Sequence, residues 1–484
     1  MLATEVFLLD SVKSSTGIKR FTEGNLTSHL VKFAIPVLLS HFMMILLNTV
    51  DMIVVGQRLG EIGTSSVSIG SSVAMFLNAF IGGFSSAAQV IIAMMIGGGK
   101  QKKISRFIST VCGFVFTIAI ASMLIMLPCT SLMLDLLNTP IEAYTGAHDY
   151  ALICIFGIVP IYFYHIISAI FRGLGDSKHP LIFISVACGL NIVLDVVFVL
   201  GFNMGVGGAA IATVIAQLVS VVLSVVVLIR KKDAFELTIK LKDFFNWDRQ
   251  ALSKFIKLAI PMAINNSAIQ IAGMVINSMT NDFGVTVSAF AGIRANIATT
   301  VDLILGSVAT AGAMIIGQNI AAGKLKRVNG TLIRVGVVSL SVSALLIILF
   351  LACPISIFGI FTKEANVLEL VYPYLPILVF SLVNAGLRPI TRALIDGSGN
   401  KRINLIVALL DAIVARIGLA FVFGVLLDWG YMGYWFGTTL AELVPILIGV
   451  VFYFTSVRKK LLKGNTEKEV QYGKQGNKAR CSGT

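Results

Sequence analysis

Residues 33–60 read FAIPVLLSHFMMILLNTVDMIVVGQRLG, an almost unbroken apolar run with a single carboxylate, Asp51, inside it. About 20 apolar residues suffice for an α-helix to cross the roughly 30 Å hydrocarbon core of a bilayer. An ionised side chain at that depth costs at least about 2.5–3.5 kcal/mol, so acids there usually face a cavity, an ion path or a partner. This stretch therefore predicts a membrane helix that contains a functional acid.

The composition of the whole chain is that of an integral membrane protein. Its 484 residues are 56% hydrophobic and only 13% charged, whereas soluble domains average about 45–50% and about 25%. A transmembrane barrel would show alternating segments of about 10 residues instead of long apolar runs. The first 29 residues lack the apolar core and cleavage site of a removable signal peptide, so we expect the first span to be retained. We therefore predict an all-α membrane protein.

Apolar runs and their breaks predict twelve spans. They lie near residues 30–56, 67–96, 107–127, 147–170, 180–201, 208–229, 258–280, 288–320, 332–353, 370–393, 403–427 and 433–457. If both termini are cytoplasmic, every Lys and Arg except Arg58, Arg294, Lys363 and Arg416 falls on an inner segment, as the positive-inside rule requires. We expect a monomer in the cell (plasma) membrane, and we interpret the net charge of +14 as a topology signal rather than a nucleic-acid footprint.

The sequence repeats itself at a distance of about 224–225 residues. KFAIPVLLS at 32–40 returns as KLAIPMAIN at 257–265, and GGGKQKK at 97–103 returns as AAGKLKR at 321–327. Internal repeats are common in membrane transporters. We predict two pseudo-symmetric six-helix lobes in parallel orientation, at 1–229 and 258–457, with a basic cytoplasmic connector at 230–257 and a disordered cytoplasmic tail at 458–484. The connector interleaves aromatic and basic residues, which fits an amphipathic helix on the inner membrane surface or a simple tether.

The first lobe contains a second intramembrane acid, Asp195, with Asn191 one helical turn before it on the same face. Counting along the helices places Asp51, Asn191, Asp195 and Thr213 at a similar depth in the outer half of the membrane. Two close carboxylates cannot both ionise cheaply at low dielectric, so either one holds a proton or a cation lies between them. Amide and hydroxyl oxygens suit Na⁺ or a protonated carboxyl. The alternative is that the two acids cap helix breaks or face different cavities.

The second lobe does not copy these acids, because the repeat aligns Asp51 with Ile276 and Asp195 with Leu419. It carries other polar residues, which we take as a candidate polar or substrate-binding cavity: Arg294, Asp302, Asn384, Asp411 and Glu442. In the alternative reading these charges only neutralise one another, Asp411 with Arg416, and Arg294 with Asp302 or Glu442. We expect Arg388, Arg392 and Asp396 to lie near the inner end, with side chains reaching the interface.

Other residues that carry chemistry elsewhere have unremarkable settings here. A lone histidine such as His41 in the first span is more often a packing residue than a proton relay. The six cysteines form no CxxC pair and no metal-ligand spacing. No P-loop pattern is present, so ATP is not expected as fuel and no cofactor is predicted.

Several motifs together carry a family resemblance. IPVLLSHFMMILLNTVDMIVVGQRLG, RGLGDSKHP at 172–180 and GAMIIGQNIAAGK at 312–324 resemble segments of the multidrug and toxic compound extrusion (MATE) family, over about 26–457. The resemblance implies a V-shaped pair of six-helix bundles that exports organic cations and other amphipathic drugs in exchange for H⁺ or Na⁺.

The same resemblance assigns the coupling site residue by residue. Asp51, Asn191, Asp195 and Thr213 match the cation site in the first lobe of part of the family. Other members rely on acids in the seventh and tenth spans, where this chain has Asn265, Asn266 and Asn384. This departure favours the first-lobe site.

We therefore expect a secondary antiporter that works by alternating access and is not an enzyme. A rival reading is a flippase for a lipid-linked oligosaccharide or peptidoglycan precursor, whose diphosphate cargo should require a basic cavity. The scarcity of intramembrane cations, essentially Arg294 and Arg416, speaks against it. A membrane-embedded transferase would need an acid-rich metal site, and the acids of this chain are scattered.

Overall fold

The structure is a computed structural model that describes residues 17–137, 139–238, 244 and 246–459. The described residues form helices joined by short turns, with no strand among them. The longer elements are α2 (Leu26–Gly97), α3 (Ile104–Leu136), α4 (Ile141–Phe156), α5 (Ile158–Gly173), α6 (Lys178–Asp195), α7 (Gly205–Arg230), α8 (Arg249–Asn281), α9 (Val285–Ala321), α10 (Leu325–Ala352), α13 (Val371–Gly397), α16 (Gly430–Ala441) and α17 (Leu443–Phe452). The shorter ones are η2 (Gln101–Lys103), η3 (Val196–Gly201), α11 (Pro354–Phe358), α12 (Ala365–Leu368), α14 (Lys401–Val407), η5 (Ala408–Ala415), α15 (Arg416–Phe421), η6 (Val422–Leu426) and η7 (Tyr453–Val457). The predicted tail beyond residue 459 lies outside the described residues.

The long helices account for the predicted spans. Ten described helices are long and apolar enough to cross a membrane, and the bent pair α4 and α5 adds an eleventh. One of the ten, α2, has 72 residues and a non-helical Gly60 inside it, at φ 62° and ψ −146°. At 1.5 Å per residue, 72 residues would extend about 110 Å, far more than one bilayer. Two spans therefore share α2, in agreement with the prediction of twelve.

By its contacts the chain divides into two units, and each is described here by itself. The first consists of Met1–Glu23 and Ser28–Met274, the second of Gly24–Thr27 and Val275–Thr484. The division lies within α8, not in the connector at 230–257. The reason is that Phe255 of α8 packs at 5.9 Å from Phe84 and 6.1 Å from Phe107. The assignment of whole lobes to 1–229 and 258–457 stays a prediction.

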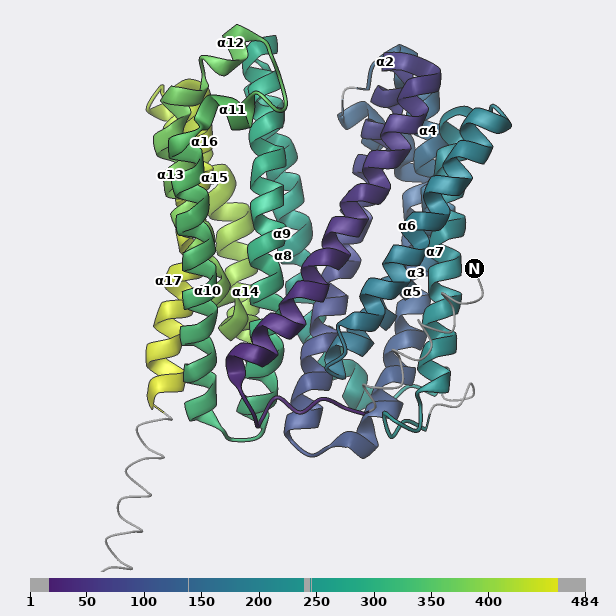
Figure 1. Cartoon of the computed structure of the whole chain (residues 1–484), viewed down its shortest axis with the longest axis vertical. Coiled ribbons are helices and arrows are strands. Elements are labelled where there is room, and N and C mark those ends of the chain that lie inside the picture. Colours follow the sequence, from purple (N-terminus) through teal and green to yellow (C-terminus); the bar gives the residue numbers. More distant parts are fainter. Residues whose placement is uncertain (1–16, 138, 239–243, 245, 460–484) are drawn as a thin grey trace, which may run out of the picture. The chain divides into compact units, whose positions relative to one another are not determined.

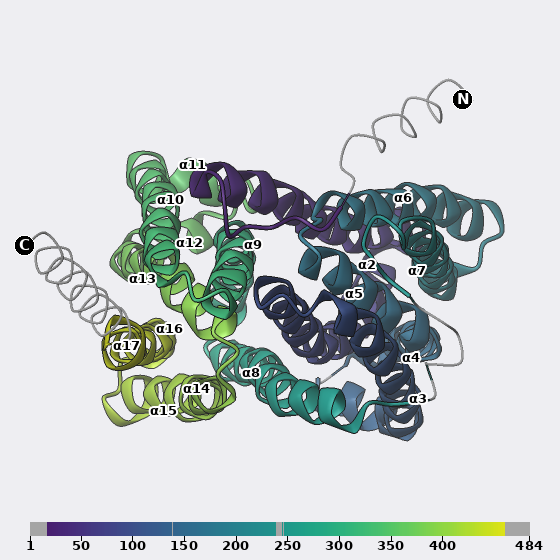
Figure 2. The same cartoon turned by 90° about the horizontal axis from the view of Figure 1, so that it is seen from below.

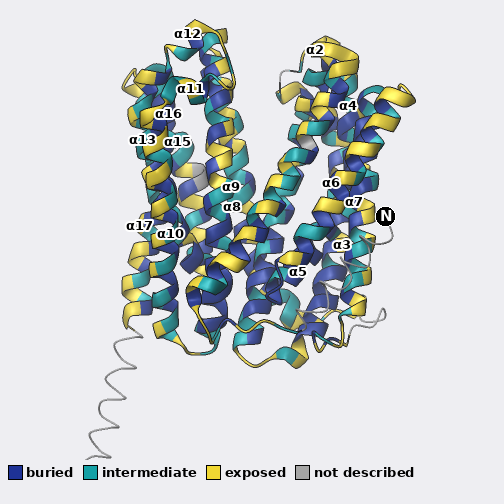
Figure 3. Ribbon diagram, viewed as in Figure 1, coloured by how far each residue is buried: buried dark blue, intermediate teal, exposed yellow. Residues whose placement is uncertain are grey.

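Each unit buries the helix faces that its own helices share. In the first unit α7 packs on α4, α5 and α6, and in the second α9, α10 and α13 pack on one another, as Figures 1 and 2 show. The buried residues in Figure 3 follow these shared faces. The outward face of α10 is apolar instead of polar, with Ile333, Val337, Leu345 and Ile348 all more than half exposed. An exposed apolar face on a helix of this length is the arrangement that lipid requires.

After Arg230 the connector forms no α-helix in its described part until α8 begins at Arg249. Residues 231–236 are turns, and residues 239–243 and 245 lie outside the described residues. Phe235 and Leu237 are buried, at 2% and 3% exposure, and Phe235 contacts Phe171 of α5 at 5.9 Å. Phe235 and Leu237, two of the residues that predicted a surface helix, therefore belong to the core of the first unit, whereas Trp247 is exposed.

The backbone repeats with the same period as the sequence. Left-handed residues occur in pairs separated by 224 or 225 positions: Gly99 and Gly323, Gly175 and Gly399, Asn203 and Asp428, and Gly205 and Gly430. The φ values of the last two pairs agree within 1°, at 56° and 55° and at 60° and 59°. Two π-helical segments, η3 and η6, also lie in corresponding places. Since glycine and asparagine tolerate this conformation at helix ends, the duplicated turns are a structural trace of the duplicated sequence.

Candidate functional site

Three helices of the first unit bring the predicted polar residues together around Asp51. The carboxylate comes from α2, Asn191 and Asp195 from the last two turns of α6, and Thr213 from α7. Asp51, Asn191 and Asp195 have no exposed surface, and Thr213 is 8% exposed. The spacing of four residues on α6 therefore does place its two polar side chains on the face that meets α2 and α7.

Asp51 accepts hydrogen bonds from three side chains. Thr213 Oγ1 and Tyr150 Oη both donate to Oδ2 at 2.8 Å, and Asn191 Nδ2 donates to Oδ1 at 3.1 Å. Asn191 Nδ2 also lies 3.2 Å from Thr213 Oγ1, which ties the two donors together. Bonds to a charged acceptor each contribute about 1.5–3 kcal/mol, so this arrangement holds one carboxylate orientation firmly.

Tyr150 is the member of the site that sequence reasoning missed. It lies on α4, which is the fourth helix to reach Asp51, and its side chain is 2% exposed. Nothing in the sequence near it distinguishes this tyrosine from the other aromatic residues of the span at 147–170. Its role follows only from the packing of α4 on α7.

Asp195 differs from Asp51 because its carboxylate oxygens accept no hydrogen bond from the described residues. Among the described residues no donor reaches either of its carboxylate oxygens, and the same holds for Asn191 Oδ1. The two acids are close enough that the charge of Asp51 acts on Asp195. Asp195 is the last residue of α6, and the π-helical turn η3 follows it at once. Wide turns of this kind inside helices occur frequently at functional sites.

These oxygens can hold a proton or a small hard cation. Buried polar atoms without a partner are costly, so three of them beside a second carboxylate mark a place where a positive ion is stabilised. Carboxylate, amide and hydroxyl oxygens match Na⁺, and a proton shared by the two acids would serve equally. No group of three or more His, Cys, Asp or Glu side chains that could hold a metal exists among the described residues, so the donor set does not fit a transition metal.

A cavity of about 50 Å³ adjoins the site. Tyr150 and Thr213, the two donors to Asp51 Oδ2, form part of its wall. Its other polar lining residues are Ser71, Asn78, Cys154, His165 and Gln217. A buried water needs about 10–15 Å³ of such space and two to four polar partners, so the cavity can hold a few waters that lead away from Asp51.

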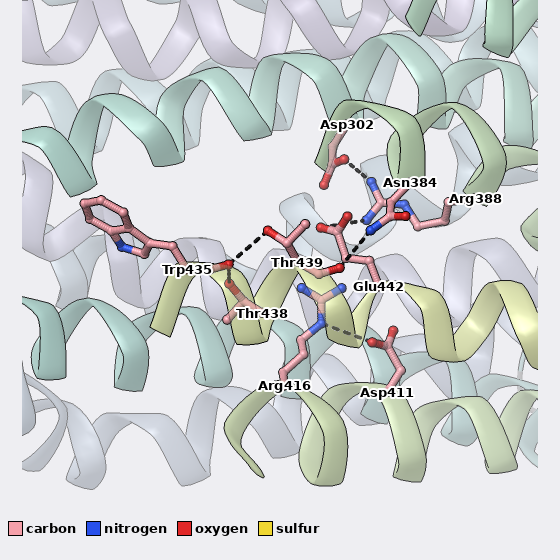
Figure 4. Close-up of polar contacts among 9 residues, drawn as sticks. All are labelled: Asp302, Asn384, Arg388, Asp411, Arg416, Trp435, Thr438, Thr439 and Glu442. Atoms are coloured by element: carbon pink, nitrogen blue, oxygen red, sulfur yellow. Dashed lines mark hydrogen bonds and ion pairs between the residues drawn. The ribbon is translucent and has the colours of Figure 1, made fainter. Parts of the chain in front are cut away.

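The charges of the second unit are arranged differently, because they are paired (Figure 4). Arg388 of α13 binds Asp302 of α9 and lies 3.7 Å from Glu442, which follows α16. Arg416, the first residue of α15, donates from Nε to Oδ1 of Asp411 in η5 at 3.2 Å. Three of the predicted residues are therefore members of ion pairs. The ion pair of Asp411 and Arg416 confirms the alternative in which these two charges neutralise each other.

Two expectations for this unit are wrong. The partner of Asp302 and Glu442 is Arg388 and not Arg294, whose guanidinium lies 5.5 Å from the ring centre of Trp435. Arg388 does not extend to an interface, since its side chain is only 15% exposed. The reason is that Asp302 and Glu442, from neighbouring helices, compensate the cost of burying the Arg388 guanidinium. The position of Arg388 along its own helix does not reveal these partners. Arg392 does lie 47% exposed and pairs with Asp396.

Asn384 is buried and does not join the charges directly. Its Nδ2 donates to the carbonyl oxygen of Thr439 at 2.8 Å, as Figure 4 shows, which fixes α13 against α16. The second unit therefore pairs three of the five predicted residues, Asp302, Asp411 and Glu442, with arginines. In the first unit no Lys or Arg among the described residues pairs with Asp51 or Asp195. The first unit therefore holds two buried acids that have no cationic partner among the described residues.

Comparison with known families gives one match that repeats. The MatE family model matches residues 36–197 and again 261–422, two copies separated by 225 residues. This confirms the internal duplication.

Individual relatives are distant but cover nearly the whole chain. A probable multidrug resistance protein of Bacillus subtilis, YoeA, is 25% identical and aligns over 88% of this chain and 93% of its own length. The multidrug export protein MepA of Staphylococcus aureus is 21% identical over 90% and 95%. A solved structure, the outward-facing conformation of a multidrug resistance MATE family transporter, has a TM-score of 0.83 and 21% identity and covers 92% of this chain and 99% of that one.

Proposed function

Since the chain belongs to the MatE family of membrane transporters, we propose that it is a multidrug efflux antiporter that exports drugs in exchange for H⁺ or Na⁺. The observation that carries this proposal is the buried pair of acids, Asp51 and Asp195, with three oxygens that no described donor reaches. A pair of carboxylates without a compensating cation is a site that gains and loses a positive ion as its surroundings change.

The transport cycle follows from that property by alternating access. In the outward-facing state an ion from outside binds at Asp51 and Asp195, and the drug leaves. The bound ion cancels the charge that otherwise opposes burial of the acids, so the lobes can rearrange to face inward. Release of the ion inside restores the charged site and prepares the protein for the next drug. The ion gradient, not ATP, supplies the energy.

The exported compounds are expected to be organic cations and other amphipathic drugs. Relatives named for multidrug resistance and export support the drug class. The acidic character of the unpaired site supports positive charge on the cargo, because an acid attracts either the coupling ion or a cation that competes with it. The methionines that line the adjoining cavity, Met44 and Met75, offer adaptable apolar contact.

The flippase reading is not favoured. A diphosphate cargo needs free guanidinium or ammonium groups in the cavity. Arg388 and Arg416 of the second unit are already paired with acids, and Arg294 lies over Trp435. We propose in addition a monomer in the plasma membrane with both termini in the cytoplasm, on the distribution of Lys and Arg.

Transport in proteoliposomes tests the function directly. The purified chain is reconstituted with ethidium inside, and efflux is followed by fluorescence under an imposed Na⁺ gradient and, separately, an imposed pH gradient. We expect one of the two gradients to drive ethidium out against its own gradient. Ethidium movement that neither gradient accelerates would contradict antiport.

A further inference from the structure

The cavity beside Asp51 forms a compartment of its own within the first unit. Its lining residues come from α2, α4, α5 and α7, and the described residues of its wall include neither Asp51 nor Asp195. Tyr150 and Thr213 form part of this wall and donate to Asp51 from it. The cavity is therefore next to the acid site and separate from it.

The cavity lies further along the helices than the acid site does. Gln217 follows Thr213 by four residues on α7, and Cys154 follows Tyr150 by four residues on α4. Each is therefore one helical turn, about 6 Å, beyond its neighbour. The distribution of Lys and Arg predicts that both helices run from the outer to the inner side. The cavity then lies between the acid site and the predicted inner side.

The hydroxyl groups of the wall have no hydrogen left to give to the cavity. Tyr150 Oη and Thr213 Oγ1 each donate to Asp51 Oδ2 at 2.8 Å, and Ser71 Oγ donates to the carbonyl oxygen of Ser68 at 3.0 Å. A hydroxyl has one hydrogen and two lone pairs. At the cavity these three oxygens can therefore act only as acceptors or as ligands of a cation.

Two amide side chains of the wall have oxygens without a donor. Asn78 Oδ1 and Gln217 Oε1 are buried and accept no hydrogen bond from the described residues, and Gln217 is only 8% exposed. A buried acceptor without a donor is costly, so it marks a partner that the protein itself does not supply. No hydrogen bond holds either amide oxygen in place, so rotation about the last side-chain bond brings it to face the cavity.

The wall carries no permanent positive charge that would oppose a cation. No Lys or Arg is among the described lining residues, and Cys154 and neutral His165 offer a sulfur and a ring nitrogen that can accept. The carboxylates of Asp51 and Asp195 are close by and attract positive charge. The electrostatics of the cavity therefore favour a cation.

We propose that this cavity is a second cation site, which binds Na⁺ through the amide oxygens of Asn78 and Gln217 and the hydroxyl oxygens of its wall. The inference rests on the proposed antiport function and gives the ion a binding place between the acids and the inner side. Na⁺ fits these ligands because it binds neutral hard oxygens, whereas a proton binds to the stronger base, a carboxylate of Asp51 or Asp195. The volume of about 50 Å³ leaves room for the ion with a few of its waters.

Equilibrium binding of radiolabelled Na⁺ to the purified chain in detergent tests the site. Gln217→Met removes the amide oxygen and keeps the length of the side chain, and Asn78→Leu does the same for the second amide. The matched control is Gln57→Met, because Gln57 of α2 is exposed and does not line the cavity. Thermal unfolding of each variant is recorded in choline chloride, without Na⁺, to separate binding from packing.

We expect Gln217→Met and Asn78→Leu each to weaken Na⁺ binding by at least about tenfold, the usual effect of losing one bond to a charged group. Gln57→Met should bind Na⁺ as wild type does. Without Na⁺, Gln217→Met should be as thermostable as wild type or more so, because it removes a buried oxygen that has no donor.

Na⁺ binding at wild-type affinity in Gln217→Met would overturn the site. Weaker binding together with a lower unfolding temperature in choline would also overturn it, because that result indicates a packing role.

The site and the antiport function fail in different ways. If wild type binds no Na⁺ and a pH gradient drives ethidium efflux, the Na⁺ site is wrong and antiport stands. If Na⁺ binding depends on Gln217 and neither gradient drives efflux, the site stands and the proposed function is wrong.

Discussion

At the scale of single residues, the proposed antiport depends on the charge of two buried acids, Asp51 and Asp195. Asp51→Asn and Asp195→Asn each remove one carboxylate without changing side-chain volume. We expect both variants to lose ion-driven ethidium efflux to background, because a single acid without its partner no longer binds and releases the coupling ion in response to the cycle. Efflux from proteoliposomes is the measurement, and the amount of folded protein recovered from the membrane is compared in parallel.

The matched control is Asp149→Asn. This acid lies on α4 beside Tyr150 in sequence, and its side chain is 60% exposed. It should transport as wild type does. Ethidium efflux at the wild-type rate from either Asp51→Asn or Asp195→Asn would refute the assignment of the ion site.

Tyr150→Phe removes one donor and leaves the ring in place. Asp51 Oδ2 then keeps only the bond from Thr213, and the loss of a bond to a charged group, about 1.5–3 kcal/mol, corresponds to a decrease of roughly tenfold or more in ion-driven efflux. The rate is measured over a range of driving gradients. Tyr144→Phe on the same helix, whose ring stacks on His148, should have no effect, and equal rates for the two variants would contradict the role of Tyr150.

The sequence indicates some of these residues and hides others for physical reasons. Asp51 and Asp195 are visible because an acid in an apolar run is expensive and stands out from its neighbours. Asn191 is visible through helical spacing. Tyr150 is not visible, because aromatic residues are common in membrane spans. Arg388 is not visible either, because an arginine near a helix end can extend its charged group to the interface at little cost. Only the approach of a second helix gives either residue its role.

At the scale of helices, close packing in the second unit depends on glycine. A Cβ on Gly437 of α16 would lie 2.5 Å from the carbonyl carbon of Leu419 in α15, a backbone atom that cannot move aside easily. We expect Gly437→Ala to lower the free energy of unfolding by about 1–3 kcal/mol, the usual cost of overpacking. Thermal unfolding in detergent measures it.

Gly418 is the matched control for that substitution. It also lies in a helix, α15, and a Cβ there would meet nothing within 4 Å. Gly418→Ala should be neutral or stabilise the protein by about 0.5–1 kcal/mol, since alanine is the better helix former. Similar destabilisation by both substitutions would show that helix contact is not the cause.

The start of α6 depends on Asp176, which lies between the spans. Its Oδ1 accepts from the backbone N of Lys178 at 3.0 Å and of His179 at 3.3 Å, and its Oδ2 lies 2.5 Å from His179 Nδ1. Burial alone would raise the pKa of Asp176, but the hydrogen bonds and charge of His179, with the charge of Lys19, outweigh it and lower that pKa. The ionised form therefore stabilises the folded state.

The lowered pKa fixes the pH dependence. The stabilisation is present above the unfolded value of about 3.9 and is lost as the pH falls through the lower folded value. Asp176→Ala should lower the free energy of unfolding at pH 7 by about 1–3 kcal/mol, and its difference from wild type should shrink below about pH 4. Asp233→Ala, at an exposed position, is the control. A difference that persists unchanged in acid would contradict this account.

Helix boundaries are predicted well where composition decides them and poorly where packing does. The polar and glycine-rich break near Gly60 separates two apolar runs, so two spans are predicted, and the non-helical Gly60 within α2 lies at this break. The π-helical turns η3 and η6 are not predicted, because the apolar runs that contain them read as continuous spans. The connector shows the same limit, since its buried residues Phe235 and Leu237 mimic the apolar face of a surface helix.

At the scale of the whole molecule, the duplicated scaffold carries an unequal charge distribution. The two halves share left-handed turns and π-helical segments at the same period. Their acids differ, because the second unit pairs Asp302, Asp411 and Glu442 with arginines, whereas no arginine among the described residues pairs with Asp51 or Asp195. Duplication thus provides two frameworks of one geometry, and one of them keeps the charge that an ion gradient can act on.

Twelve spans with cytoplasmic termini require the connections to alternate sides, and single cysteines test this on the intact molecule. In a variant with its native cysteines replaced by serine, Lys102→Cys lies after two predicted spans and should react with a membrane-impermeant thiol reagent only in inverted vesicles. Glu61→Cys, at the break within α2, and Lys363→Cys, between α11 and α12, should react in intact cells, because they follow one and nine spans. All three positions are exposed in the structure, so the side of the membrane decides the reaction. Protection of Glu61→Cys on both sides would mean that α2 does not supply two spans, and labelling of Lys102→Cys in intact cells would reverse the orientation that the Lys and Arg distribution predicts.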